Sequence, residues 1–218
     1  MTEQPLALDE FWYKLRLRSI TFDLPDEKVG SGTGRGEVLS ASRGDVLWSG
    51  KAEITLNRHS AQDQVKALLD EVRHGGARFL VCDPKRRGPQ YDFWGVKQGA
   101  STAEIAEVDA SDRRRLVLRG MPSGFRLTAG DLISIQYGSD PVRYFLARIQ
   151  RGGTFGVRGS HFELRVLPFL PVGLAVGQVV SLRDPVCNAV YVPDSYRPIV
   201  RRPGHDEGFE FQWRQTYR

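Results

Sequence analysis

The chain has 218 residues, with 31 lysine and arginine residues against 26 aspartate and glutamate residues and a formal net charge of +5. Hydrophobic residues make up 40% of the sequence, which is too apolar for a disordered chain, and no coiled-coil or collagen-like period runs through it. The length suits one large domain or two small ones. The 23 glycines and 12 prolines indicate many turns and a β-rich fold.

Nothing in the chain predicts a membrane span or a secretory leader. The longest apolar stretch, 164–180, is interrupted by Arg165 and by prolines and glycines, whereas a helical span needs about 20 near-continuous apolar residues. The first residues carry neither a basic segment nor an apolar one. Cys82 and Cys187 form neither a CxxC pair nor a disulfide framework, so we expect two buried thiols in a reducing compartment.

The N-terminal region is predicted to begin with a strand and a glycine-rich segment. Alternating apolar and basic residues predict a strand over 12–22, with a bulge at Ser19 where the apolar parity shifts. Residues 26–36 combine charged residues with glycines at alternate positions. This composition indicates a loop, or an arm that orders only against a partner.

A hairpin and a helix are predicted next. Segments 37–41 and 46–56 are expected to pair about a turn at 42–45. Apolar residues at helical spacing predict an amphipathic helix over 60–74, with Ser60 as its N-cap and a glycine pair after its end.

Short strands dominate the rest of the chain. A strand at 77–83 precedes a loop over 85–99, and 101–109 fits either a strand or a helix. Strands at the spacing of a small barrel or sandwich are then expected at 115–119, 131–137, 142–150, 161–167, 178–183 and 188–192. The alternation of Phe209, Phe211 and Trp213 with polar residues predicts a last strand that pairs back into a sheet.

These patterns predict a mainly β fold, a β-sandwich or barrel, with one amphipathic α-helix packed on the N-terminal sheet. We expect three parts: a β-sandwich-like domain over 1–120 that contains the helix 60–74, a small β-barrel-like domain over 121–192, and a C-terminal segment over 193–218 whose strand returns to a sheet.

Residue patterns for catalysis and metal binding are missing from the sequence. None of the four histidines stands at ligand spacing from another histidine or a cysteine, so no metal site is expected. No GxSxG or HExxH motif occurs, and the glycines of 30–36 do not lead into a phosphate-binding helix. Asp83 and Asp92 could pair as glycosidase carboxylates, but their loop offers nothing to fix their separation. We therefore expect no enzyme and no cofactor.

Two groups of residues are candidates for contacts with other molecules. The basic clusters could bind a phosphate backbone, but interleaved acids favour a solvated face or a subunit contact. The subunit-contact candidates are Lys28, Arg35, Arg86, Arg87, Arg113, Arg114 and Arg115. Tyr91, Phe93 and Trp94 could stack on a glycan or on bases, and the favoured alternative is that they fill a crevice or a subunit interface.

A family resemblance rests on the order of several patterned strands. The first stretch comprises LWSGKAEI at 47–54, VKALLDEV at 65–72 and FLVCDP at 79–84, and the second comprises FRLTAGDLISI at 125–135, YFLAR at 144–148 and LRVLP at 164–168. In this order, over 12–213, the chain resembles distal tail proteins and related minor tail proteins of long-tailed bacteriophages.

The resemblance implies a structural virion protein of the phage tail tip, assembled in the cytoplasm of the host bacterium. Such proteins form a ring, commonly a hexamer, through a β-sandwich domain, here 1–120, with a helix on one side. The implied partners are further copies of the chain, the tail tube protein, and hub, fibre or tape-measure proteins. Any contact with DNA in the lumen is expected to be independent of sequence. The alternatives are a carbohydrate- or host-receptor-binding module that uses Tyr91, Phe93 and Trp94, and a cell-wall hydrolase.

Overall fold

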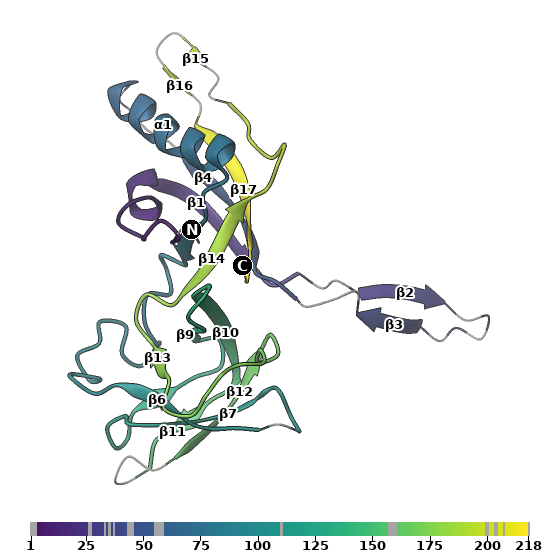
Figure 1. Cartoon of the computed structure of the whole chain (residues 1–218), viewed down its shortest axis with the longest axis vertical. Coiled ribbons are helices and arrows are strands. Elements are labelled where there is room, and N and C mark those ends of the chain that lie inside the picture. The colour runs from purple at the N-terminus through teal and green to yellow at the C-terminus, as the bar shows by residue number, and fades with distance from the viewer. Residues whose placement is uncertain are drawn as a thin grey trace.

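The chain forms two lobes and a projecting hairpin, as the computed structural model shows (Figure 1). The structure describes residues 4–25, 28–32, 34, 36, 38–42, 46–54, 59–109, 111–156, 161–198, 201–202, 205–206 and 208–217. One lobe holds a sheet with the helix, the other holds a barrel, and the hairpin extends sideways near the level where the lobes meet. The predicted fold class, mainly β with a single helix on a sheet, is confirmed.

The sheet lobe is built on one antiparallel sheet. Its strands in spatial order are β1 (Leu17–Asp23), β4 (Ser49–Ile54), β17 (Phe209–Gln215), β14 (Val186–Tyr191) and β5 (Phe79–Cys82). The last strand pairs with both β4 and β14, as its alternating aromatic residues predict. Phe209, Phe211 and Trp213 all point into the core, because residues two apart share a face of a strand.

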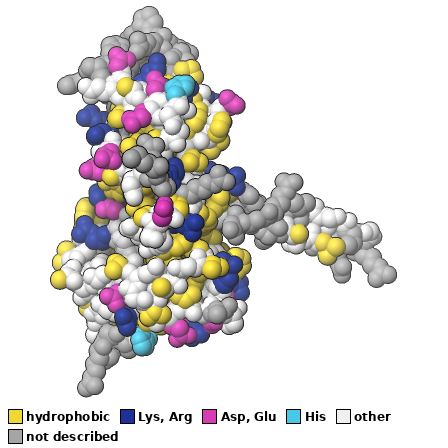
Figure 2. Space-filling view, in the orientation of Figure 1, with side chains coloured by type: hydrophobic (Ala, Val, Ile, Leu, Met, Phe, Trp, Pro, Cys, Tyr) yellow, Lys and Arg dark blue, Asp and Glu magenta, His cyan; other side chains and the backbone are white. Residues whose placement is uncertain are grey.

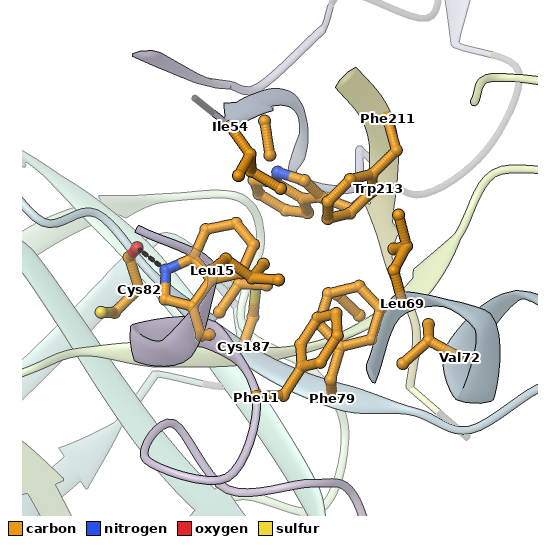
Figure 3. Packing of buried hydrophobic residues seen from close by; sticks show 14 of the residues in the cluster. Phe11, Leu15, Ile54, Leu69, Val72, Phe79, Cys82, Cys187, Phe211 and Trp213 are labelled. Atoms are coloured by element: carbon orange, nitrogen blue, oxygen red, sulfur yellow. Dashed lines mark hydrogen bonds between the residues drawn. The ribbon is translucent and has the colours of Figure 1, made fainter. Parts of the chain in front are cut away.

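Helix α1 (His59–Gly75) covers the inner face of this sheet. Its residues Leu69 and Val72 lie in the same buried cluster as Phe79 and Phe211, as Figure 3 shows. The predicted apolar stripe is thus confirmed, and Gly76 takes the left-handed conformation expected after the helix end. The helix begins at His59, so Ser60 lies within the first turn and the prediction of Ser60 as N-cap is wrong by two positions.

Two N-terminal predictions are wrong. Residues Trp12–Leu15 form the short 3-10 helix η1 instead of the start of a strand, because Trp12 and Leu15 are both buried and three-residue spacing puts them on one side. The bulge in β1 is confirmed, with the register shift between Leu17 and Ser19. The hairpin 37–56 does not form: β3 (Val38–Ser42) pairs with β2 (Lys28–Gly32), while β4 pairs with β1 and β17.

The second lobe is a closed barrel. Its strands in order around the barrel are β10 (Arg143–Arg151), β12 (Phe162–Leu167), β7 (Arg115–Arg119), β6 (Ala103–Val108), β13 (Val179–Ser181) and β9 (Leu132–Tyr137). Residues that face inward from these strands fill a second core, which includes Phe145, Ile135 and Leu164. Short strand pairs complete the described structure: β8 (Arg126–Leu127) with β11 (Gly153–Thr154), and β15 (Arg201–Arg202) with β16 (His205–Asp206).

The lobes do not follow the expected domain limits. Strands β6 and β7 fall within 1–120 but belong to the barrel, and β14 falls within 121–192 but belongs to the sheet. Among the described strands, the first lobe is a single sheet covered by a helix, not two stacked sheets. The chain crosses from sheet to barrel after β5 and returns before β14, so the barrel is an insertion between two strands of the sheet. No helix in the described part of the chain is long and apolar enough to span a membrane.

Both cysteines are free and fully buried, which confirms the expectation of two buried thiols. Cys82 lies opposite Val186 and Cys187 lies opposite Val81, so the two thiols point to opposite faces of the paired strands. Burial raises the pKa of Cys82 to about 11 and that of Cys187 well above its usual value.

We expect neither thiol to react in the folded protein. At about pH 8, a chromogenic disulfide reagent should label no cysteine in native protein and both in concentrated guanidinium, because each thiol is desolvated and protonated when the chain is folded. Rapid stoichiometric labelling of the native protein would contradict this packing.

Candidate functional site

The β2–β3 hairpin is the feature that most distinguishes the surface. Among the described strands, β2 and β3 pair only with each other, and the hairpin extends away from both lobes (Figure 1). Its described side chains carry no charge (Figure 2). The side chain of Leu39 is 60% exposed. An isolated two-stranded hairpin is marginally stable in water. A segment of this kind gains stability when it packs on another surface, so we take the hairpin as the candidate contact element.

Trp48, which follows the hairpin in the chain, ties the sheet lobe to the barrel. Its indole Nε1 donates to the carbonyl oxygen of Leu146 on β10 at 2.8 Å, and its backbone N–H donates to Gln215 Oε1 at 3.1 Å. The side chains of Leu132 and Leu146 come from the barrel strands but pack in the core of the sheet lobe. Trp48 is completely buried in this contact between the two lobes, which we call the lobe joint.

Arg148 stacks on the ring of the same indole. Its guanidinium carbon is 4.8 Å from the centre of the Trp48 ring, a cation–π geometry. Its Nε is buried and has no hydrogen-bond partner among the described residues. Desolvation lowers the pKa of Arg148. The aromatic face therefore supplies a stabilising contact to this partly desolvated cation.

A second contact holds together the two segments that cross between the lobes. Arg87, on the outgoing segment, binds Asp184, on the returning one, through Nε at 2.6 Å and Nη2 at 3.2 Å. The backbone N–H of Asp184 donates to the carbonyl oxygen of Arg87 at 2.7 Å. The Tyr13 hydroxyl donates to the carboxylate of Asp184 at 3.2 Å. Burial alone would raise the pKa of Asp184, but the bonds from Arg87 and Tyr13 lower it below its ordinary value.

Substituting Asp184 with asparagine should lower stability at neutral pH and leave it unchanged in acid. Because the folded-state pKa of Asp184 is lowered, its contribution is present above the unfolded pKa of about 3.9 and is lost as the pH falls below it. We expect a loss of about 1 kcal/mol at neutral pH, since the pair is bidentate but partly exposed. Urea unfolding from acid to neutral pH measures the difference. The matched control is Asp194→Asn, which alters an exposed carboxylate; an equal, pH-independent loss in both variants would refute the assignment.

The predicted basic residues have partners within their own chain. Arg86 donates to the carbonyl oxygen of Gly130 at 3.3 Å, and Arg113 donates to that of Leu170 at 2.9 and 2.7 Å. The remaining pairs join Arg114 to Asp112 at 3.3 Å, and Arg115 to Asp109 at 2.9 Å and to Glu163 at 3.1 Å. Arg86 and Arg87 thus lie at the lobe joint, while Arg113–Arg115 lead into β7. The side chain of Lys28 and all of Arg35 lie outside the described residues.

The loop that carries Tyr91, Phe93 and Trp94 exposes one of these three rings to solvent, that of Trp94. Tyr91 packs edge-on against Phe125 with 5.7 Å between centroids, and the ammonium of Lys97 lies 3.5 Å from its ring centre. Phe93 is half-buried and contacts Trp94, which is 73% exposed. The crevice-filling interpretation therefore describes Tyr91, and Trp94 is the residue free to meet a partner.

Asp92 fixes the conformation of this loop. Its side chain is 5% exposed and accepts the backbone N–H of Gln98 at 2.7 Å. Burial alone would raise the pKa of Asp92, but hydrogen bonds from the backbone of Gln98, Lys97 and Val96 lower it. The backbone N–H groups of the loop thus hold this carboxylate in place.

Sequence reasoning did not identify the contacts of the joint. The sequence pattern assigns Trp48 only to a strand. The oxygen that accepts its indole N–H belongs to the backbone of a residue 98 positions away, and no pattern of side chains marks a backbone carbonyl as an acceptor. Within the described residues, no group of three histidine, cysteine or acidic side chains could hold a metal ion. In the comparisons with known proteins, no family model matched the chain, and no curated protein matched it.

Proposed function

We propose that this chain is a structural subunit of a bacteriophage tail tip, where copies of it form a closed ring. The observation that carries the proposal is the β2–β3 hairpin, which is paired only with itself among the described strands and projects from the body of the molecule. A projecting element that docks on a different surface of the next copy makes a head-to-tail contact, and such contacts close into a ring when the rotation per subunit permits.

The contacts between the lobes support the same proposal. The Trp48 hydrogen bond and the stacking of Arg148 on the same indole connect the lobes at one point, and the Arg87–Asp184 pair connects the two crossing segments at another. A ring of defined size needs subunits whose contact surfaces keep a constant relative orientation. The proposed ring is six-fold, as in the tail proteins the sequence resembles. It joins the tail tube to hub, fibre or tape-measure proteins and is assembled in the cytoplasm of the host bacterium.

A glycan platform made of Tyr91, Phe93 and Trp94 has less support. A sugar-stacking platform needs open aromatic faces, and Tyr91 is covered by Phe125 and Lys97. A lone exposed tryptophan on a rigid loop better suits a protein contact, where tryptophan is enriched among the residues that carry binding energy. We therefore place Trp94 among the contacts of the proposed assembly.

Electron microscopy and mass measurement of the purified full-length protein test the ring. We expect closed particles of one size in negative stain and the matching multiple of the 24.5 kDa chain mass in solution. A protein that stays a single copy at every concentration, and that is absent from purified phage tails, would overturn the proposal.

A further inference from the structure

A cavity of about 480 Å³ lies on the outer wall of the barrel beside the sheet lobe. Ile133 and Ile135 face the barrel core, so the residues that alternate with them on β9 face outward into this cavity. Across the strands, Gln136 lies opposite Tyr144 of β10, and Ser134 lies opposite Ser181 of β13. Val186, at the start of β14, closes the side toward the sheet lobe. The strand register thus brings side chains from both lobes to one hollow, which we call the junction cavity.

The lining of the junction cavity is polar but carries no charge. Its polar side chains are Ser134, Gln136, Tyr137, Tyr144, Gln178 and Ser181, and its remaining lining residues are valines and a glycine. Three other cavities of 400–420 Å³ are each lined by at least one lysine or arginine. The junction cavity therefore differs from them in chemistry rather than in size.

Several of these polar groups have hydrogen-bonding capacity to spare. Ser134 is only 3% exposed, and among the described residues no hydrogen bond uses its hydroxyl, the Tyr144 hydroxyl or the Gln136 amide. Gln178 accepts the Ala175 N–H at 3.0 Å, which leaves its amide NH₂ for a ligand. A buried polar group gains most from a ligand that completes its bonding.

We propose that the junction cavity binds a neutral saccharide. Hydroxyl and amide groups can both donate to and accept from sugar hydroxyls, while the ring of Tyr144 and the side chains of Val179 and Val186 offer apolar surface to the C–H faces of a sugar ring. The volume lies within the usual range of small-molecule sites, and such sites occur preferentially where domains meet. A phosphate or carboxylate would enter without a countercharge among the lining residues, at a cost in desolvation.

Saturation-transfer NMR with the full-length protein tests this site. The probes are maltotriose, cellotriose and lactose as neutral saccharides, with glucose 6-phosphate and glucuronate as charged counterparts. We expect at least one neutral saccharide to bind with a dissociation constant on the order of 1 mM, a value ordinary for a shallow sugar site, and the charged counterparts to bind at least tenfold more weakly.

Two variants and a control locate the binding. Gln136→Ala and Tyr144→Phe each remove polar atoms that no described residue uses, so both should fold normally and weaken binding at least fivefold. Gln150→Ala, an exposed residue on β10 that does not line the cavity, should bind like the wild type. The proposal is overturned if no neutral saccharide binds, if the charged counterparts bind equally well, or if the two cavity variants bind unchanged. Particle size, measured on the same samples, reports separately on the ring.

Discussion

Replacing Trp48 with alanine is expected to lower the free energy of unfolding by about 3–5 kcal/mol, the range for removing a large buried aromatic side chain. The change leaves a cavity in the joint, removes the donor to the Leu146 carbonyl and takes away the ring beneath Arg148. Each loss acts where the sheet lobe meets the barrel, so the two lobes should also unfold less cooperatively. Urea unfolding followed by circular dichroism measures both effects.

A second variant of Trp48 separates the effect of packing from that of hydrogen bonding, and a variant of Trp94 serves as a control. Trp48→Phe keeps most of the buried ring but leaves the Leu146 carbonyl without its donor, and should cost about 1–3 kcal/mol. Trp94→Ala makes the same chemical change as Trp48→Ala on an exposed loop and should cost less than about 0.5 kcal/mol. If both tryptophan-to-alanine variants lose the same stability, Trp48 does not anchor the joint.

Removing the hairpin should abolish ring formation while leaving the body folded. In the variant, a short glycine-serine linker replaces 26–45 and connects the end of β1 to the segment before β4. Because β2 and β3 pair only with each other among the described strands, their removal takes no hydrogen-bonded neighbour from the strands of either lobe. The midpoint of thermal unfolding should therefore stay within a few degrees of the wild type, the shift that corresponds to about 1 kcal/mol.

A point variant makes the same test without deleting chain. Leu39→Asp places a charge on an exposed apolar residue of the hairpin, where a docked neighbour would have to bury it. Mass photometry should show single subunits for both variants at concentrations where the wild type forms rings, with Val172→Asp as a matched control on an exposed barrel loop. Rings of normal size formed by the hairpin-deleted protein would remove the main support for the proposed function.

The joint and the hairpin are linked through Trp48. The residue that anchors the sheet lobe to the barrel follows β3 by only a few positions, so the hairpin emerges beside a buried and hydrogen-bonded segment. In a ring, this arrangement would direct each hairpin toward the same place on its neighbour.

Local patterns were sufficient for much of the secondary structure. The alternation of Phe209, Phe211 and Trp213 identified a half-buried strand, and the stripe that includes Leu69 and Val72 identified the helix. Each pattern reports which face of a segment avoids water, and this information is carried within a few neighbouring residues. The broad fold class follows from the types of these segments and from their buried faces.

Strand partners and domain limits depended on the tertiary structure. Nothing near β3 distinguishes pairing with β2 from pairing with β4, because the pattern that predicts a strand does not specify its partner. Nothing near β6 assigns it to the barrel instead of the sheet, because both choices bury the same face. The Trp48 contact with Leu146 spans 98 residues, and the junction cavity exists only because three barrel strands turn their outward side chains toward β14. The sequence by itself determined most of the elements and their buried faces, because these depend on neighbouring residues; the long-range packing of the chain decided the joint, the projecting hairpin and the cavity.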